Sequence, residues 1–336
     1  MIAIRSCVAV TLLGSLAVSS PLVAQSFFAT QVLGSNTNAN AGGGVFQPAN
    51  ALGAPQGSSA VHSLGIAGDL TLGFAVPITN GPGADFIVGE NPFTFSSAWW
   101  QSFAEVMFVE VSSDGVNFCR FESSYYGPQA HPGAFGTVPI GTYSGLAGQT
   151  PVLATDPTVD SRDVVDAGGD AFDLEDLSTH PLVLSGVVDL TAITAVRLVD
   201  VVSGSSLDSA GVAIFDPGSG SADVDHITVI HQQGQVANGC PNIELSIQSD
   251  GLMLLRIEDP DGIGDLDPTS LHAAVFGIPL DAGGVLSGFF VQSVDANGIT
   301  LVQPFPLPSN LLFTLSFSIK DMQGNRSGQA RTRPGN

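Results

Sequence analysis

The sequence predicts an all-β protein with two domains, a jelly-roll-like β-sandwich followed by a smaller immunoglobulin-like β-sandwich. Forty Gly and 21 Pro among 336 residues indicate many turns and short strands. Hydrophobic residues make up 44% of the chain and charged residues only 12%, which suffices for a large core and excludes global disorder. Apolar and polar residues alternate over short runs, as in half-buried strands, and no segment between residues 25 and 235 has helical periodicity.

Residues 1–24 have the three-part layout of a secretory signal peptide, with an apolar run at 7–18 and cleavage expected after Ala24. The run is too short to span a bilayer. We therefore expect a secreted, extracellular protein without membrane insertion, and its association with the cell surface stays open. The mature chain keeps Cys119 and Cys240, which an oxidising compartment can join, but their wide separation in sequence leaves this pairing open.

The first domain is expected at residues 25–236. A loop-rich segment with one early strand comes first, and a turn at 112–115 joins two later strands into a hairpin. Alternating or apolar runs predict strands at 30–33, 70–76, 103–111, 116–121, 182–190, 195–202 and 226–231.

A Gly- and Gln-rich linker at 232–239 leads into the second domain, which is expected at residues 240–336. Strands are predicted at 243–248, 252–258, 271–276, 288–294, 299–302 and 311–320. About seven short strands in a segment of this length are typical of an immunoglobulin-like sandwich. We expect residues 331–336 to form a polar end of the chain.

The chain is strongly acidic. Lys and Arg number 9 against 31 Asp and Glu, which gives a formal net charge of −22. Nucleic acid and anionic membranes are therefore excluded as partners, because their phosphate groups repel such a chain. Cations are favoured instead.

The acidic segment at 168–177 is the clearest candidate site. Its two glycines allow a tight turn, and Phe172, Leu174 and Leu177 can pack inward and fix the carboxylates between them. Two further acidic turns lie at 83–91 and 216–226. Hard oxygen ligands on rigid loops suit calcium, which takes about six to eight oxygens. We predict one calcium site with the ligands Asp85, Glu90, Asp170, Asp173, Asp223 and Asp225; the alternative is three solvated loops of an acidic protein.

The second domain has an acidic run of its own, DPDGIGDLD at 259–267. Its spacing differs from that of an EF-hand, which needs acidic residues at positions 1, 3 and 5 and Glu at position 12. A plain acidic turn and a weak calcium site made by Asp259, Asp261, Asp265 and Asp267 both stay open.

No catalytic constellation is recognisable, and we predict that the protein is not an enzyme. Of the six histidines only His226 and His231 have zinc-ligand spacing, and we expect them to point to opposite faces of a strand. No Gly-x-Ser-x-Gly run lies between a strand and a helix. Paired carboxylates can hydrolyse glycosides, so an enzyme acting on polysaccharide is a distant alternative. Trp99, Trp100, Tyr125 and Tyr126 can form a stacking platform for sugar rings, which makes a carbohydrate-binding module the nearer alternative.

Several short motifs follow one another in the first domain: ALGAPQG at 51–57, GDLTLGF at 68–74, NGPGADF at 80–86, SDGVNF at 113–118 and AFDL at 171–174. Over residues 50–231 the chain resembles bacterial secreted cell-surface proteins of the PEP-CTERM type. The resemblance implies an extracellular β-sandwich and favours calcium. This sequence departs from the pattern at 89–91 and 222–225, where Glu90, Asp223 and Asp225 are nevertheless kept, and we expect no C-terminal sorting anchor.

The second domain carries IEDPDG at 257–262 and IKDMQGN at 319–325, and it resembles bacterial immunoglobulin-like and cadherin-like modules. Together these features predict a secreted, calcium-stabilised structural or adhesive protein of the bacterial cell envelope. The partners that remain are a surface polysaccharide or an envelope protein.

Overall fold

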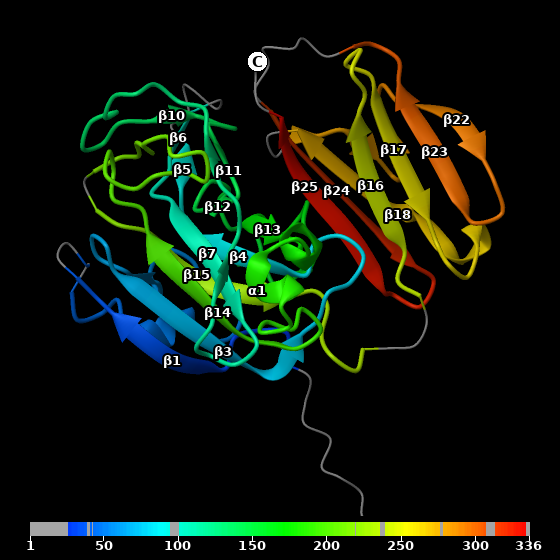
Figure 1. Ribbon diagram of the computed structural model, residues 1–336. Coiled ribbons are helices and arrows are strands. Elements are labelled where there is room, and N and C mark those ends of the chain that lie inside the picture. The colour runs from blue at the N-terminus through cyan, green and yellow to red at the C-terminus, as the bar shows by residue number, and fades with distance from the viewer. Residues whose placement is uncertain are drawn as a thin grey trace, which may run out of the picture.

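The computed structural model describes residues 26–38, 41, 43–94, 101–218, 220–235, 239–275, 278–306 and 313–333. The predicted signal peptide, Trp99, Trp100 and residues 236–238 of the predicted linker lie outside these residues. The described chain is almost entirely β and forms two β-sandwiches that lie side by side (Figure 1). Among these residues, no helix is both long and apolar enough to span a membrane.

Two sheets face each other in the first domain. One contains β1 (Gln31–Asn36), β3 (Asp69–Ile78), β14 (Ile193–Asp200), β7 (Met107–Ser112) and β12 (Leu146–Ala147) in that order, with β8 (Cys119–Arg120) also paired to β7. The other contains β13 (Asp170–Phe172), β4 (Phe86–Glu90), β15 (Asp223–Val229) and β2 (His62–Ser63). Among the strands of these two sheets, from β2 onward, the chain crosses from one sheet to the other except along β7, β8 and β12, which stay in one sheet. This alternation is that of a jelly roll.

Two small sheets and three short helices complete the first domain. A three-stranded sheet contains β10 (Val138–Pro139), β6 (Gln101–Phe103) and β5 (Phe93–Thr94), and a two-stranded sheet contains β11 (Tyr143–Ser144) and β9 (Ser124–Tyr125). The short helices are η1 (Pro48–Ala51), η2 (Leu174–Leu177) and α1 (Pro181–Leu184).

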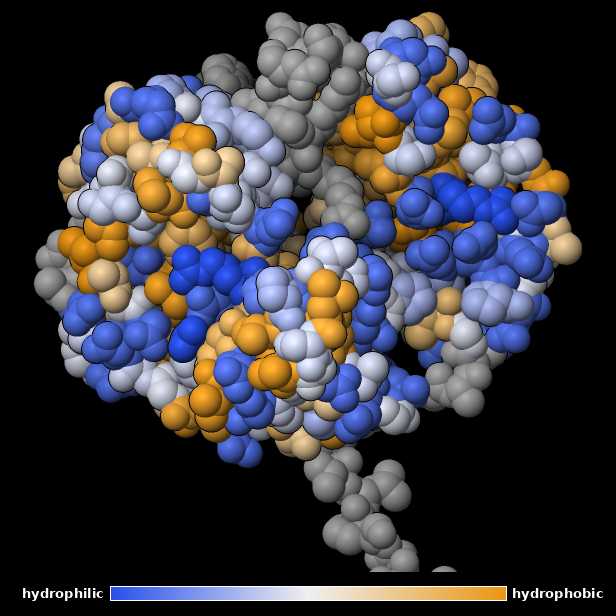
Figure 2. Space-filling model, viewed as in Figure 1, coloured by the Kyte–Doolittle hydropathy of each residue, from blue (hydrophilic) through white to orange (hydrophobic). Residues whose placement is uncertain are grey.

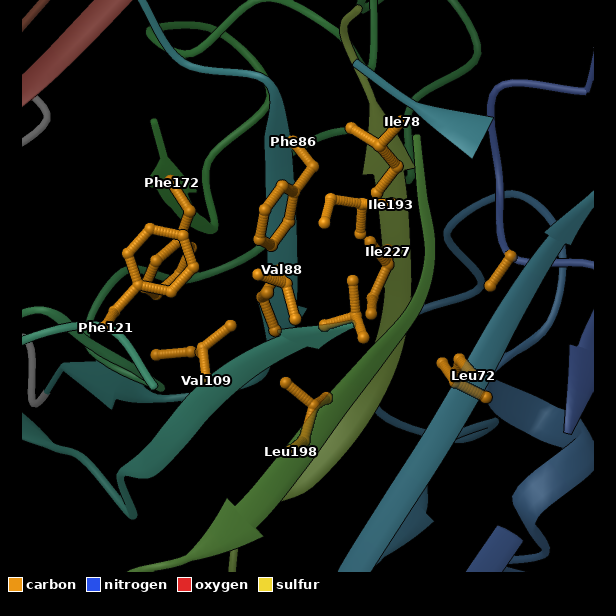
Figure 3. Close-up of a cluster of buried hydrophobic side chains, with 14 of the residues drawn as sticks. Leu72, Ile78, Phe86, Val88, Val109, Phe121, Phe172, Ile193, Leu198 and Ile227 are labelled. Atoms are coloured by element: carbon orange, nitrogen blue, oxygen red, sulfur yellow. The ribbon is translucent and has the colours of Figure 1, made fainter. Parts of the chain in front are cut away.

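The core of the first domain lies between its two sheets. Phe86, Phe121 and Phe172 point toward one another, with ring centroids 5.0 to 6.0 Å apart (Figure 3). Aliphatic side chains from both sheets, such as Val88 and Leu198, extend this cluster (Figure 3). Burial of these alternating positions is what holds the sheets face to face.

The predicted strand at 182–190 is wrong, because the segment begins with helix α1 and continues as a turn. Pro181 stands at the first helical position, where a missing N–H costs nothing, and the side chain of His180 accepts a hydrogen bond from the Leu182 N–H at 3.2 Å. Leu182 and Val183 then pack against the core from the helix. The apolar run that contains Leu182 and Val183 therefore indicates that the segment is buried. It does not distinguish a strand from a short helix, because both can bury such a run.

The second domain is an immunoglobulin-like sandwich, as predicted. One sheet has the order β16 (Asn242–Ile247), β17 (Met253–Glu258), β23 (Gly298–Gln303) and β22 (Phe290–Val294). The other has the order β19 (Ile278–Pro279), β18 (Leu266–Val275), β24 (Phe313–Asp321) and β25 (Arg326–Arg333). Apart from the short edge strand β19, these are the A-B-E-D and C-F-G arrangements of that fold. A short hairpin of β20 (Asp281–Ala282) and β21 (Val285–Leu286), and η3 (Ile263–Asp265), complete the domain.

Strand β25 corrects the expectation of a polar end, because residues 326–333 pair with β24 along its whole length. Its sequence, RSGQARTR, lacks the apolar alternation that marks a half-buried strand. Its strand conformation comes instead from the hydrogen bonds that it forms with the edge of β24. The core of this domain is separate and includes Leu255, Leu315 and Phe317.

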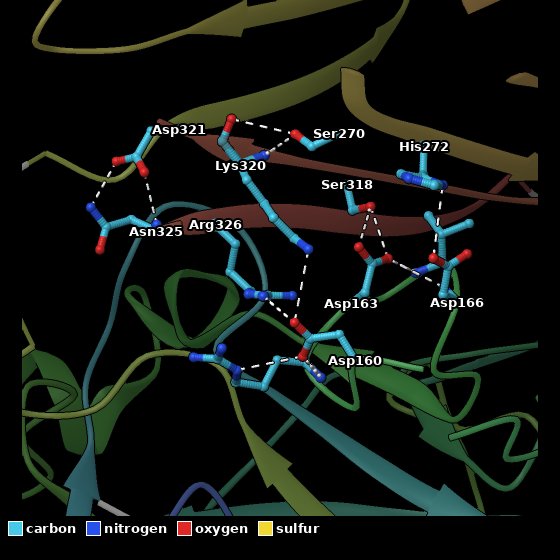
Figure 4. Close-up of polar contacts among 12 residues, drawn as sticks. Asp160, Asp163, Asp166, Ser270, His272, Ser318, Lys320, Asp321, Asn325 and Arg326 are labelled. Carbon is cyan, nitrogen blue, oxygen red and sulfur yellow. Dashed lines mark hydrogen bonds and ion pairs between the residues drawn. The ribbon is translucent and has the colours of Figure 1, made fainter. Parts of the chain in front are cut away.

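A polar interface joins the domains, where the first-domain loop at 156–168 meets β24 and β25 (Figure 4). Ser318 donates to both carboxylate oxygens of Asp163, at 2.8 and 3.0 Å, and Asp160 forms ion pairs with Arg326 and Lys320. The Ala84 N–H also donates to the carbonyl of Gly328 at 2.8 Å. On the face seen in Figure 2, hydrophilic residues cover much of the second domain and mix with hydrophobic ones on both domains.

Removing one hydroxyl should loosen this interface. Ser318 and Asp163 are both buried, so Ser318→Ala leaves a buried carboxylate with fewer donors and should cost about 1 to 3 kcal/mol. Hydrogen exchange of the 156–168 loop should quicken. The matched control is Ser316→Ala on the same strand, since Ser316 forms no side-chain hydrogen bond within the described residues. Equal hydrogen-exchange rates of the loop in the two variants would show that the Ser318–Asp163 contact does not stabilise the interface.

Candidate metal centre

The acidic segment at 168–177 folds as the sequence predicts, with carboxylates on a rigid backbone. Gly168 and Gly169 have φ angles of 67° and 73°, which side chains other than Gly rarely adopt. Strand β13 follows, and Asp173 then caps η2 by accepting a hydrogen bond from the Glu175 N–H at 2.9 Å. Phe172, Leu174 and Leu177 are buried in the core.

Strand β4 separates the predicted ligands into two groups. Asp85 precedes the strand and Glu90 ends it, so about 17 Å of extended chain lies between them. Because β13 runs antiparallel to β4, Asp170 lies toward the Glu90 end and Asp173 toward the Asp85 end. Asp223 belongs with Glu90, since its N–H donates to the Glu90 Oε1 at 3.1 Å. The six predicted residues therefore do not surround one point.

Asp85 has a structural role. Its carboxylate is fully buried and accepts hydrogen bonds from the N–H groups of Gly81 and Leu174, both at 2.7 Å. It also contacts Nδ1 of His231 at 2.8 Å. These contacts hold three segments of the chain together.

Asp170 and Asp225 likewise hold loops. Asp170 accepts from the N–H groups of Gly148 and Gln149 at 2.7 and 2.8 Å, and burial raises its pKa to about 6 in spite of these bonds. Asp225 accepts from the N–H groups of Gln56 and Gly57 at 3.0 and 3.1 Å. The second pair explains the family-like motif at 51–57, whose last two amides meet this carboxylate.

Six carboxylates gather at the end of the sandwich where β4 and β14 end and where β7, β13 and β15 begin. We call this set the acidic end; it comprises Glu90, Glu105, Asp170, Asp200, Asp216 and Asp223. Glu90, Asp170 and Asp223 are among the predicted ligands, whereas Glu105, Asp200 and Asp216 were not predicted. All three missed residues are at most 9% exposed.

Signals for the missed residues exist in the sequence. Glu105 opens an otherwise apolar stretch, and Asp200 ends an apolar strand. Asp216 starts the acidic turn from which only Asp223 and Asp225 were chosen. An isolated acid inside an apolar run needs a partner when buried, which makes it a candidate site residue.

Burial, and after it repulsion between neighbouring carboxylates, disfavours the charged form of the acids at the acidic end. Burial and neighbouring carboxylates, chiefly that of Asp223, raise the pKa of Glu105 to about 8. Burial and the nearby Asp200 raise the pKa of Asp216 to about 8, and burial raises the pKa of Asp200 itself to about 7. Burial also raises the pKa of Glu90 well above its ordinary value.

Glu110 shows what a neutralised acid looks like in the same domain. It is buried in β7, and the guanidinium groups of Arg120 and Arg197 lie 2.7 and 2.5 Å from its two oxygens. Within the described chain, no Lys or Arg forms an ion pair with any member of the acidic end. Glu105, five residues earlier, has no such positive partner.

Three oxygen atoms of the acidic end are buried without a hydrogen-bond partner: Glu90 Oε2, Glu105 Oε1 and Asp216 Oδ1. Such atoms are rare in folded proteins, because each costs about 1 to 3 kcal/mol or more if charged. Either a proton or a cation can neutralise them. No three acidic side chains of the described first domain bring oxygens within 4.8 Å of one another. A calcium ion there would need further ligands from backbone carbonyls and water.

Two residues of the predicted sugar platform lie among the described residues, and of these Tyr126 is half-buried. Tyr125 is buried, donates its hydroxyl to the Pro128 carbonyl at 2.8 Å and packs on Tyr143, while Trp99 and Trp100 lie outside the described residues. A cavity of about 570 Å³ lies between the domains. It is lined by loops and by β11, β12 and β13 of the first domain, including Asp170, and by β18, β19, β24 and β25 of the second. Glu105, Asp200 and Asp216 do not line it. Cys119 and Cys240 are free thiols, so they do not form the disulfide left open above.

No family model matches this chain, and no curated protein is similar to it in sequence.

Proposed function

We propose that this protein is a secreted, non-catalytic structural or adhesive component of the bacterial cell envelope whose first domain is stabilised by calcium. The observation that carries the proposal is the acidic end, where three buried carboxylate oxygens lack any partner. The signal-like N-terminus and the family resemblance support secretion and the envelope. Two adjoining β-sandwiches are suited to a spacer or adhesin.

Calcium is favoured over a transition metal by the chemistry of the donors. The acidic end offers carboxylate oxygens, which hard cations prefer, while the softer sulfur and imidazole ligands of zinc are not among its members. Calcium also tolerates irregular shells of six to eight oxygens, so it can join carboxylates that do not converge tightly.

Burial supports the non-catalytic part of the proposal. Glu105 and Asp216 have raised pKa values, as general acids do, but they are only 9% and 3% exposed. Neither the cavity between the domains nor the second cavity near Cys240 is lined by them. A general acid must reach its substrate, whereas an ion ligand can be sealed from solvent.

The test replaces two charges of the acidic end by isosteric amides. We expect calcium to raise the melting temperature of the wild-type protein, and to have little effect on the Glu105→Gln/Asp216→Asn variant, because the repulsion that calcium relieves is gone. The matched control is Glu122→Gln/Asp189→Asn, which changes the same charge at exposed positions and should keep the wild-type response. Identical calcium responses in all three proteins, together with no calcium found by elemental analysis, would reject the proposal.

A further inference from the structure

A second set of carboxylates converges at one end of the second domain, where the segment at 259–265 meets the turn between β24 and β25. Asp259, Asp265 and Asp321 each place one carboxylate oxygen within 4.8 Å of the others. Their carboxylates come from three segments that are far apart in sequence or separated by a turn. Asp261 is exposed and lies outside this set, and Asp267 instead accepts hydrogen bonds from the N–H and hydroxyl of Thr269.

Backbone hydrogen bonds fix the three segments before any ligand binds. The Asp259 N–H donates to the Asn297 carbonyl at 2.9 Å, and the Met322 N–H donates to the Asp265 carbonyl at 2.7 Å. Gly262, with a φ of 105°, makes the turn between Asp259 and Asp265. The arrangement is therefore held by the backbone, although it brings like charges together.

Asp259 supplies the observation that a plain acidic turn does not explain. Its side chain is 0% exposed. Oδ1 accepts a hydrogen bond from the Asp261 N–H at 2.8 Å, which accounts for the turn, but Oδ2 is buried without a hydrogen-bond partner. Within the described chain Asp259 has no ion-pair partner. A buried carboxylate oxygen in this state requires a cation or a proton.

Asp321 is, by contrast, held in place by its own turn. Its Oδ1 accepts from the N–H groups of Gln323 and Asn325 at 2.9 and 2.8 Å, and its Oδ2 accepts from the Asn325 side chain at 2.7 Å (Figure 4). Carboxylate oxygens can accept more than one bond each, so these contacts orient Asp321 without exhausting it.

The spacing fits a calcium ion. Calcium–oxygen distances are about 2.3 to 2.6 Å, so two ligands on opposite sides of the ion lie about 5 Å apart. Oxygens within 4.8 Å of one another can therefore all contact one ion. We propose that Asp259, Asp265 and Asp321 bind a calcium ion at this end of the second domain, independently of the acidic end in the first domain.

Binding here also acts on the domain interface. The turn that begins at Asp321 leads directly into Arg326 and Gly328, which contact the first domain through Asp160 and Ala84. An ion that fixes this turn fixes the start of β25, and with it the interface.

The test counts calcium ions by equilibrium dialysis of the full chain with radioactive calcium. Asp259→Asn keeps the shape of the side chain and its acceptor for the Asp261 N–H, and it should bind one ion fewer than the wild type. Asp267→Asn is the control with the same charge change, and it should bind as the wild type does. Without calcium, Asp259→Asn should be at least as stable as the wild type, because it removes a buried uncompensated charge.

The two sites are separated by combining variants. The Glu105→Gln/Asp216→Asn protein should still bind the ion that depends on Asp259, even if the first domain binds none. Asp265→Asn, at a less buried position, repeats the test should Asp259→Asn fail to fold. Equal numbers of bound ions in Asp259→Asn, Asp265→Asn and Asp267→Asn would overturn the inference.

Discussion

The calcium-free protein is expected to lose stability as the pH rises from about 5 to 8. Glu105, Asp216 and Asp200 have pKa values of about 8, 8 and 7 in the folded state, far above the ordinary values near 4. A carboxyl whose pKa is raised by folding holds its proton longer in the folded state than in the unfolded state. Its stabilising effect is complete below about pH 4 and is lost as the pH rises through the folded pKa.

Calcium should reverse this loss, and most strongly at pH 8. Protons and calcium compete for the same oxygens, so binding weakens as the carboxyls are protonated. At about 1,000 times its dissociation constant, a ligand that binds only the folded state adds about 4 kcal/mol. For a domain of about 200 residues this corresponds to a rise in melting temperature of about 8 to 16 °C. At pH 5 the rise should be small.

Melting curves from pH 5 to 9, with calcium and with a chelator, check this expectation. His231 also contributes to the pH dependence. Burial lowers its pKa, but hydrogen bonds led by that to Asp85 outweigh burial and raise it to about 10, so its stabilising effect falls steadily above about pH 6.5. That effect is independent of calcium, and the difference between the two curves removes it. A calcium effect that is the same at pH 5 and pH 8 would contradict the assignment of the acidic end.

Asp85→Ala is expected to destabilise the protein by about 3 to 5 kcal/mol, the cost of breaking a buried ion pair from one side. Both nitrogens of His231 face acceptors, with Nδ1 at 2.8 Å from Asp85 and Nε2 at 3.1 Å from the Arg326 carbonyl. The ring therefore donates from both nitrogens and is positively charged. Without Asp85 this charge is buried alone, and the N–H groups of Gly81 and Leu174 lose their acceptor.

Denaturant unfolding measures the effect, and Asp189→Ala is the matched control. Asp189 also accepts two hydrogen bonds, from the N–H and hydroxyl of Thr191, but it is exposed and should cost no more than about 1 kcal/mol. Because the Arg326 carbonyl belongs to the second domain, Asp85→Ala should also speed hydrogen exchange at the start of β25. If Asp85→Ala lowered the free energy of unfolding as little as Asp189→Ala does, then His231 would be neutral or solvent would reach the Asp85–His231 pair.

Much of the fold could be predicted from local pattern. Period-two alternation marked β3 and β24, and the turn at 112–115 marked the β7–β8 hairpin, because side-chain direction and turn chemistry are properties of a few adjacent residues. The same holds for segment 168–177, whose glycines and apolar anchors behave as expected. Strand β25 could not be predicted in this way, because its conformation depends on pairing with the edge of β24 and not on its own side chains.

What only the tertiary structure decided is which acids meet. Asp85 and Glu90 are neighbours in the sequence, yet an extended strand carries them to opposite ends of the sandwich. Glu105 and Glu110 are equally close in the chain, but only Glu110 meets an arginine from β14 as well as one from β8. The sequence alone predicted an all-β, acidic protein with carboxylates on Gly-rich loops that suit a cation. Whether the positive partner of a buried acid is an arginine or must come from solution depends on which strands lie beside each acid, and that is a property of long-range pairing.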